Sequence, residues 1–593
     1  MKILVLLFLT LLSVRASNIF GGDSFSDGSE IVLIAPINIL PAGGFFPVRV
    51  EMINKGIAER SWSLSFGSIV NSYYYRGSRN SEAEEIISNF TVTCPPNLTR
   101  TVELLVPVHQ RIDPWSGERR VRVNMSRGDG ESNYDVFELE PSFDAHLGMS
   151  GDLLTRFEAE ISNAWMGITE ENARSTRRRY SSSIITVAGG VDAKKLPSDW
   201  RAYAGYDTLV LSRQDYLVLE PGAKAAIEKW VSGGGNLVVL KDGENALLPG
   251  FEEDHVSQGF GHKSLLQCGE NYADFKALDL KILLSNTGPS QVEQATRHYN
   301  VNIWGIGREL GVRSLGTTFI LIALIVFAII VGPVNLFFWA NKNQRQRLLW
   351  TTPLISLIAS LLLVGFIMLK DGFGGEGARA IAIDVGGPDD NYAALIQEQF
   401  SRTGILLNSD FSFDKDSVFI PVPAPATDFN RIGSAASYGV FSAAIQPSDE
   451  GWSVEGDFFQ SRAERAQILR SVTPSRERLE FLPRTGVAPQ LVSSFSYPLT
   501  DIFFRDQDDK VWTASSIASG ATVTMTRSSA EAQAARLSPT IERFGEAHGQ
   551  TLQVLTERPG SFSALAENAP ALETHTSIDW QDSPALITGL LIK

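Results

Sequence analysis

The densest group of acidic side chains in the sequence is Asp506-Gln507-Asp508-Asp509. Carboxylate oxygens on a loop are suitable ligands for Ca²⁺. An EF-hand-like loop, however, needs acidic or amide side chains at alternating positions, a central glycine and a distal glutamate. The residues around Asp506 lack that pattern. We therefore expect a solvated hairpin turn here, because Asp is a frequent turn residue.

Cysteine and histidine would offer a different chemistry, nucleophilic catalysis. A thiol nucleophile needs a base within hydrogen-bond reach, and His255, His262 and His298 are near Cys268 in the sequence. Cys268 closes the short run 264–267, which is typical of the end of a strand and not of an exposed sharp turn. The seven histidines show no HExxH motif and no i, i+4 pair, which argues against a histidine metal centre.

The sequence contains two cysteines, Cys94 and Cys268. They could form a disulfide between two domains in an oxidising compartment. Two separate buried thiols are the favoured interpretation, since free Cys is among the most buried residue types.

Glycines could let the backbone approach a ligand at two places. Gly189-Gly190 follows an expected strand but is not a GxGxxG motif, so we expect a flexible loop. Gly305, Gly307 and Gly311 miss that motif by one residue, and we expect a flexible joint. The sequence thus predicts no catalytic residue, no cofactor-binding residue, no metal ligand and no cofactor.

The composition indicates folded domains. A chain of 593 residues can hold several domains of about 100–200 residues each. Its hydrophobic content of 44% and charged content of 20% are ordinary for globular domains, so disorder is not the default. The net charge of −15 argues against nucleic acid as a partner.

Two apolar segments dominate the hydropathy pattern, and we expect transmembrane helices at 315–340 and 351–370. No charged side chain occurs from Thr317 to Ala340 or from Thr351 to Leu369. A hydrocarbon core ~30 Å thick needs about 20 apolar helical residues, so each segment is long enough to span it.

The short segment between them, 341–350, carries Lys342, Arg345 and Arg347 and no acid. Such an excess of positive charge is typical of a cytoplasmic loop. Both large portions of the chain would then lie on the extracytoplasmic side of the membrane, and the lipid bilayer would be a partner.

Gly332-Pro333 and Asn335 interrupt the first apolar segment. Proline removes a helix hydrogen bond and kinks the helix, while a buried amide requires a partner. We expect a kinked helix packed against its neighbour in preference to a transport pathway, because no ionisable residue lies within Thr317–Ala340 or Thr351–Leu369.

The N-terminus has the form of a signal peptide, residues 1–16, with Lys2 before the apolar run Ile3–Leu12 and small residues before a cleavage point after Ala16. An uncleaved anchor is the alternative. In either case we expect the chain beyond residue 16 to be exported.

The remaining chain divides into three expected domains. Short runs of period-2 pattern separated by turns predict a β-sandwich-like domain at 17–148. Alternating helix and strand signals, including strands at 207–212 and 236–240 and a helix from Pro221 to Ser232, predict an α/β domain at 149–314. Residues 371–593 are expected to form a mostly β periplasmic domain.

Several motifs carry a family resemblance. Leu196-Pro197 to Trp200, Asp207-Thr208-Leu209-Val210-Leu211 and Gly233-Gly234-Gly235-Asn236-Leu237-Val238 resemble the class I glutamine amidotransferase-like domain of exported bacterial membrane proteins. Gly332-Pro333-Val334-Asn335 is similar to a motif in an uncharacterised group of two-span membrane proteins.

The resemblance implies a multidomain α+β membrane protein. It would contain an N-terminal β-sandwich, a flavodoxin-like α/β amidotransferase-like domain, a two-helix transmembrane hairpin and a C-terminal mostly β domain. Working members of the class place a cysteine on a strand-to-helix turn, but this chain reads Lys241-Asp242-Gly243-Glu244 after the strand at 236–240. The resemblance therefore implies a catalytically inactive domain.

Together these features predict a binding or scaffolding protein of the bacterial inner membrane, with protein partners in the cell envelope. One alternative is a periplasmic hydrolase that uses Cys268 or an unrecognised active site. Another is an accessory subunit of a transport or sensing system.

Overall fold

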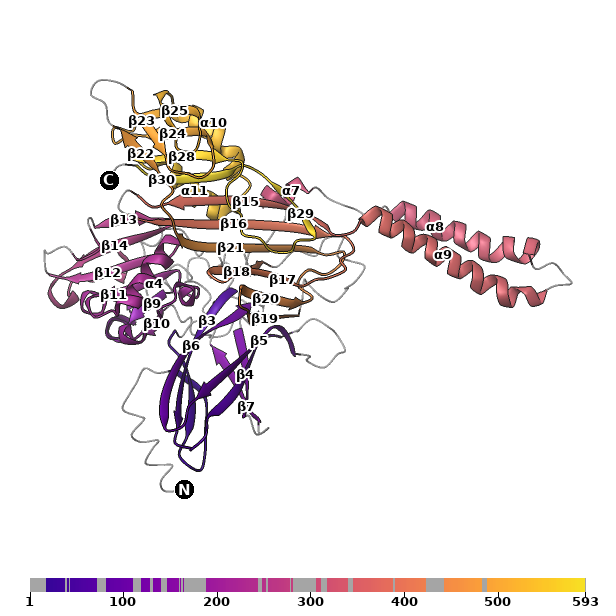
Figure 1. Ribbon diagram of the computed structural model, residues 1–593, viewed down its shortest axis with the longest axis horizontal. Helices are drawn as coiled ribbons and strands as arrows, with labels where there is room; N and C mark the ends of the chain where they lie inside the picture. The colour runs from indigo at the N-terminus through magenta and orange to yellow at the C-terminus, as the bar shows by residue number, and fades with distance from the viewer. Residues whose placement is uncertain are drawn as a thin grey trace.

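In this computed structural model, five β-sheets form the larger part of the regular secondary structure of the described residues (Figure 1). The structure describes residues 18–37, 40–41, 43–71, 82–109, 119–127, 132–139, 147–158, 160–161, 164, 188–243, 248–251, 254–277, 279–280, 305–310, 317–339, 345–387, 390–422, 442–482 and 488–591. The expected signal peptide, residues 1–16, lies outside the described residues.

Two sheets pack face to face at the N-terminal end. One has the order β1-β2-β3-β6, and the other contains β5-β4-β7-β8. Apolar side chains that alternate along these strands meet between the sheets, with Trp62, Phe46 and Val106 fully buried. The strand bounds are β1 Asn18–Ser24, β2 Glu30–Ala35, β3 Gly43–Asn54, β4 Arg60–Asn71, β5 Glu82–Cys94, β6 Leu98–His109, β7 Arg119–Arg127 and β8 Ser132–Leu139.

The second of these sheets continues into the C-terminal part of the chain. Its order is β17-β20-β19-β5-β4-β7-β8, in which β17 (Phe411–Asp414), β19 (Ala443–Pro447) and β20 (Gly451–Gly456) come from beyond residue 371. The residues before and after the apolar segments therefore fold together, which local sequence patterns do not reveal.

A mainly parallel sheet forms the α/β unit, in the order β10-β9-β11-β12-β14-β13. Its first five strands are parallel and β13 pairs antiparallel with β14 at the edge. The bounds are β9 Leu147–Ser150, β10 Ala188–Val191, β11 Thr208–Ser212, β12 Asn236–Asp242, β13 His255–Gln258 and β14 Gly261–Cys268. The short helices between them are η1 Ala193–Lys195, η2 Trp200–Tyr203, α3 Arg213–Leu217 and η3 Glu270–Tyr272.

Local signals set the helix of this unit. Helix α4 spans Pro221–Ser232, with Pro at its first turn and Gly233 at its C-cap, as the sequence predicts. Its buried face, which includes Ile227 and Trp230, packs on the sheet. The strands expected at 207–212 and 236–240 are confirmed as β11 and β12.

The largest sheet has the order β18-β21-β16-β15-β30-β28-β24-β25-β27, with β29 also paired to β15. Its bounds are β15 Gly375–Val385, β16 Tyr392–Thr403, β18 Ser417–Val422, β21 Glu464–Pro474, β24 Leu499–Arg505, β25 Val511–Ile517, β27 Thr526–Arg527, β28 Ser561–Ala566, β29 Ile578–Asp582 and β30 Ala585–Leu590. A small sheet of β22 (Leu479–Leu482), β23 (Gln490–Ser493) and β26 (Thr522–Thr524) lies beside it, and helices α10 (Ala530–Ile541) and α11 (Glu546–Glu557) complete this part.

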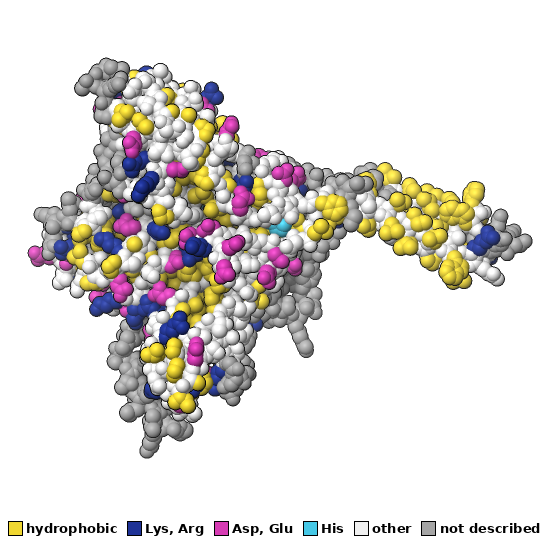
Figure 2. Space-filling model, viewed as in Figure 1, with side chains coloured by type: hydrophobic (Ala, Val, Ile, Leu, Met, Phe, Trp, Pro, Cys, Tyr) yellow, Lys and Arg dark blue, Asp and Glu magenta, His cyan; other side chains and the backbone are white. Residues whose placement is uncertain are grey.

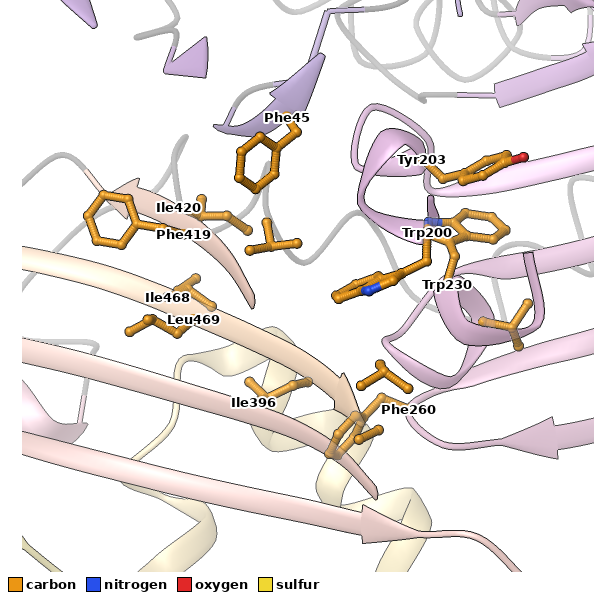
Figure 3. Close-up of a cluster of buried hydrophobic side chains, with 14 of the residues drawn as sticks. Phe45, Trp200, Tyr203, Trp230, Phe260, Ile396, Phe419, Ile420, Ile468 and Leu469 are labelled. Carbon is orange, nitrogen blue, oxygen red and sulfur yellow. The ribbon is translucent and has the colours of Figure 1, made fainter. Parts of the chain in front are cut away.

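One hydrophobic core joins the α/β unit, the largest sheet and the end of β3 (Figure 3). Phe45 comes from β3, Trp230 from α4 and Leu469 from β21, and all three are buried. Burial of such side chains stabilises the fold by roughly 1.5–3 kcal/mol each. The three regions therefore share one core and are not independently folded domains.

An apolar arm projects from this body (Figure 1). We use this name for α8 (Thr317–Ile329), the π-helical segment η4 (Ile330–Trp339) and α9 (Leu348–Asp371). Contacts join α9 to η4, and buried Asn335 donates a hydrogen bond from Nδ2 to Thr352 Oγ1 at 3.0 Å. The expected partner for Asn335 is thus present.

The expected two-helix transmembrane hairpin is wrong, and with it the fold class of a multidomain α+β membrane protein. The described chain is mostly β, and one helix in it, Arg345–Phe366, is long and apolar enough to cross a membrane. The other apolar segment is a 13-residue helix followed by ten π-helical residues around Pro333. Hydropathy counts apolar residues and does not register that Pro333 cannot donate a backbone hydrogen bond.

Candidate functional site

The carboxyl edge of the parallel sheet is where ligands bind in open α/β folds. Ser150, Ser212 and Cys268 end their strands at this edge. Ser212 N donates to Ser150 Oγ at 2.9 Å, and Ser212 Oγ accepts from Asp215 N at 3.0 Å, which caps α3. Both serine hydroxyls are thus engaged with backbone amides.

Cys268 is enclosed by apolar side chains of the α/β unit and is 2% exposed. Burial, with smaller effects of Asp274 and Asp279, raises the pKa of its thiol to about 11. Near neutral pH the Cys268 side chain is therefore a protonated thiol, whereas the thiolate is the nucleophilic form. The structure places it at a strand end, as the sequence predicts.

The histidines near Cys268 in sequence do not reach it. His262 precedes Cys268 by six residues on the same strand, which is roughly 20 Å at ~3.3 Å per residue. His255 stacks on His262 with ring centroids 5.2 Å apart. His298 lies outside the described residues. The geometry therefore offers no Cys–His pair between Cys268 and either described histidine.

Serine hydroxyls hold the two stacked rings. Ser264 Oγ lies 2.8 Å from His255 Nδ1, and Ser257 Oγ lies 3.1 Å from His262 Nδ1. Burial, followed by the influence of His255 and Arg558, lowers the pKa of His262 to about 4. His262 is consequently neutral at physiological pH.

The two cysteines are separate buried thiols, as expected. Cys94 lies in the core of the N-terminal sandwich and Cys268 in the core of the α/β unit. Neither is available for reaction at the surface.

The acidic group forms the hairpin turn between β24 and β25, which confirms the turn interpretation. Asp506 Oδ1 accepts from the backbone amides of Asp508 and Lys510 at 3.0 and 2.8 Å. Asp509 pairs with Arg505 at 2.6 Å. The carboxylates are engaged within the turn. Among the described residues no group of three or more His, Cys, Asp or Glu side chains is placed to hold a metal ion.

The glycine interpretations are wrong. Gly189 and Gly190 lie inside β10, paired with Gly148 and Met149, and not in a loop after a strand. Gly305 begins α7 (Gly305–Glu309), where a Cβ would lie 2.0 Å from the Glu542 carbonyl oxygen.

Helix α7 is instead a docked element. Ile306 is fully buried, and its amide donates to Arg543 O at 3.0 Å. Glu309 pairs with Arg543 at 2.6 Å. The segment before the apolar arm is thus fixed to the loop after α10, and Gly311 lies outside the described residues.

Buried polar contacts that the sequence did not indicate join the units. Asp384 on β15 accepts from Thr588 Oγ1 at 2.7 Å, and its other oxygen lies 3.5 Å from Tyr392 Oη. The Tyr392 oxygen in turn accepts from Gly259 N, in the β13–β14 turn, at 2.7 Å. Burial raises the pKa of the Asp384 carboxyl. This chain of contacts fastens the α/β unit to the largest sheet.

A second buried set joins α11 to the same sheet. Glu398 accepts from the Gly545 amide at 2.8 Å and bonds His548 Nδ1, while Arg470 lies 3.1 Å from His548 Nε2. Burial is the largest influence on the pKa of His548 and lowers it. Because these groups face one another inside the core, they position α11 and do not form an accessible catalytic set.

A groove of about 390 Å³ lies between α10 and α11. Its apolar floor includes the buried Leu537. Of the described residues that line it, Glu531, Glu542 and Glu557 are acidic and Arg505 alone is basic. Arg505 is paired with Asp509. This charge balance disfavours an anionic ligand.

Most of the exposed large hydrophobic side chains among the described residues lie on the apolar arm (Figure 2). Aliphatic side chains cover its length, and aromatic side chains gather near its tip beside Arg345 and Arg347. Exposed members include Leu321, Leu324, Phe337, Phe338, Trp350, Leu357 and Leu361. Contiguous apolar patches of this kind mark interaction sites for lipid or protein.

Comparison with known proteins does not assign this chain to a family. No protein-family model matches the chain, and no curated protein matches its sequence. The sporulation control protein Spo0M from Bacillus subtilis aligns over 26% of this chain and 56% of its own length, with 9% identity and a TM-score of 0.15. The chain thus spans less than two thirds of Spo0M.

Two further solved structures align with similar scores. The yeast delta-COP-I mu-homology domain matches 36% of this chain and 95% of its own, with 9% identity and a TM-score of 0.18. A beta-glucuronidase from glycoside hydrolase family 2 matches 98% of this chain and 62% of its own, with 8% identity and a TM-score of 0.16. Scores this low support no argument, and the amidotransferase-like resemblance stays a prediction.

Proposed function

We propose that this protein is a membrane-anchored binding or scaffolding protein whose folded body lies entirely on one side of a lipid bilayer. One observation carries the proposal: β5 and β19, from before and after the apolar arm, pair in one sheet. Because a sheet cannot be divided by a membrane, both portions of the body occupy the same compartment.

In this proposal α9 is the membrane anchor, because it holds the one helix among the described residues that is long and apolar enough to cross a bilayer. The α8–η4 segment lies beside it in the arm and is not a second regular transmembrane helix. Aliphatic side chains are exposed along α9, whose 24 residues extend roughly 36 Å at ~1.5 Å per residue. That length matches a hydrocarbon core of ~30 Å. The exposed Arg345 and Arg347 at the tip favour the cytoplasmic side, so the body would lie on the extracytoplasmic side of a bacterial inner membrane.

A binding role for the body is supported by the environment of its candidate nucleophile. Cys268 is buried with a raised pKa, and the described histidines near it in sequence are remote or stacked on each other. These observations count against the hydrolase alternative that uses Cys268. We propose that the α/β unit serves in a complex with envelope proteins.

Labelling from one side of the membrane tests the anchoring. Single cysteines would replace Ile57, before the arm, and Val554, after it; both are highly exposed. A membrane-impermeant maleimide added to intact spheroplasts should label both sites, and an Arg345→Cys site only after lysis. The buried Cys94 and Cys268 keep the background low. Protection of the Val554 site in spheroplasts that label Ile57→Cys would refute the proposal.

A further inference from the structure

Two exposed apolar side chains lie at the root of the arm. Phe373, two residues after the end of α9, is 70% exposed, and Leu407 is 92% exposed. Phe373 forms an isolated parallel bridge with Ile405. Leu407 is two residues from Ile405, so its Cα lies within ~7 Å of that bridge. The two side chains belong to neighbouring loops on the same part of the surface.

The backbone fixes this arrangement. Gly374 N donates to Ile405 O at 2.9 Å, Gly404 N donates to Gly374 O at 2.7 Å, and Ile405 N donates to Gly372 O at 3.0 Å. Gly372 and Gly374 have φ of +74° and +83°, where a side chain would be strained. Phe373 thus stands on a turn held rigidly against the neighbouring loop.

The loops carry no charge that would have to be dehydrated. Residues 372–375 and 404–409 contain neither acidic nor basic side chains. Figure 2 shows apolar side chains where the arm meets the body. A lipid headgroup region accepts aromatic and aliphatic loop residues of this type.

The length of α9 places these loops relative to the bilayer. Trp350, near the tip, and Asp371, the last residue of α9, are separated by roughly 32 Å of helix at ~1.5 Å per residue. This distance is close to the ~30 Å thickness of a hydrocarbon core. If Trp350 lies at one interface, Phe373 lies at the other.

We infer that Phe373 and Leu407 form a second lipid contact, in which the body rests on the headgroup region beside the arm. This inference depends on the proposed membrane anchoring and deepens it. The contact fixes the orientation of the body relative to the membrane plane, which an arm alone would leave free to tilt.

Site-specific fluorescence in the full-length protein tests the contact. Phe373→Cys and Leu407→Cys would each be labelled with an environment-sensitive maleimide dye and reconstituted into vesicles of phosphatidylethanolamine and phosphatidylglycerol. Some of the lipids would carry a nitroxide quencher near the glycerol backbone. Leu361→Cys, exposed on α9, reports arm insertion. Ile57, on the turn between β3 and β4, is 96% exposed, and Ile57→Cys serves as the matched remote control.

We expect severalfold stronger quenching at positions 373 and 407 than at position 57, with position 361 protected from an aqueous quencher. If position 361 is protected while positions 373 and 407 match position 57, the second contact is refuted and the anchoring stands. If position 361 is open to the aqueous quencher, both the contact and the anchoring are refuted.

Discussion

Ala443 on β19 lies directly opposite Ile86 on β5 in parallel register, although the apolar arm separates the two residues in the chain. Both side chains are buried in the core that joins the N-terminal sandwich to the rest of the body. The pairing closes the chain into one body from which the arm projects.

Truncation of Ile86 should destabilise both portions of the body. We expect Ile86→Ala to cost about 2–5 kcal/mol, because it removes a buried aliphatic side chain and leaves a cavity. Limited proteolysis should show faster cleavage on both sides of the arm. Ile57→Ala, at an exposed position, should change stability by less than about 0.5 kcal/mol. Faster cleavage confined to residues before the arm would show that the two portions are not coupled.

Loss of a buried carboxylate should be equally costly in the largest sheet. Arg402 donates from Nε and Nη2 to Glu464 Oε1 at 2.9 and 2.7 Å, and both side chains are buried. Glu464→Ala leaves the guanidinium without this partner, for which about 3–5 kcal/mol is typical. Glu376, 3.5 Å from Arg402, remains and should keep the loss near the lower value.

The exposed pair Arg478–Glu480, at 2.9 Å, is the matched control for that experiment. Glu480→Ala should cost less than about 1 kcal/mol, since water screens exposed pairs. Chemical unfolding of the two variants measures the difference. Equal losses would mean that burial of the Arg402–Glu464 pair has no bearing on stability.

Stability should fall as the pH is lowered from about 6.5 toward about 4. Folding lowers the pKa of His262 from its usual value of 6.5 to about 4, so between these two pH values His262 is protonated in the unfolded chain and neutral in the folded chain. The depressed pKa of His548 acts in the same direction. The raised pKa of Asp384 acts in the opposite direction, because protonation of that buried carboxyl favours the fold.

Substitution of one histidine isolates its part of this dependence. Between about pH 7.5 and about pH 5, the denaturant concentration at the unfolding midpoint should fall less in His262→Gln than in the unsubstituted protein. The part of the fall that is due to His548 should remain. His255→Gln, at the exposed neighbour, controls for loss of ring stacking. An unchanged slope in His262→Gln would show that His262 does not titrate as its burial requires.

The native thiols should be inert in the folded protein. At pH 8, a thiol with a pKa of about 11 is ionised to about one part in a thousand, and both cysteines are buried. We expect no labelling by a maleimide in native buffer and two labels per chain in denaturant. Rapid native labelling that Cys268→Ala abolishes would revive the cysteine hydrolase alternative.

Sequence patterns predicted the elements whose signals are local. Pro221 and Gly233 mark the two ends of α4, and continuous apolar runs mark β11 and β12. Proline geometry, glycine freedom and β propensity act within a few residues, so such signals can be read without knowledge of the fold.

Long-range contacts could not be predicted in this way. The pairing of Ile86 with Ala443 joins two strands that are far apart in the chain. The period-2 pattern of each strand shows which side chains share a face, but it does not show which strand is the partner. Gly305 suggested a flexible joint, but the close approach of α7 to the Glu542 carbonyl requires a residue without a side chain. A glycine in the sequence is thus compatible both with a flexible joint and with a rigid, close backbone contact, and the sequence alone does not distinguish them.

The polar pair inside the apolar arm provides the last prediction. Asn335 Nδ2 donates to Thr352 Oγ1 at 3.0 Å between η4 and α9, and the buried Asn335 Oδ1 has no hydrogen-bond partner among the described residues. Thr352→Val should therefore destabilise the arm by about 0.6–1.7 kcal/mol, which are the average and the maximum for such bonds between helices in a membrane. Thr351→Val is the matched control, because Thr351 Oγ1 bonds the Arg347 carbonyl of its own helical region at 3.0 Å and not η4.

Replacement of the asparagine should have a smaller effect than replacement of the threonine. Asn335→Leu removes the hydrogen bond but also removes the unsatisfied Oδ1, so gain and loss partly cancel. Unfolding of the reconstituted protein by added dodecyl sulfate, followed by fluorescence of a dye at Leu361→Cys, would measure all three variants. If Thr352→Val unfolds with the same midpoint as Thr351→Val, the Asn335–Thr352 bond does not hold η4 against α9, and apolar packing alone must do so.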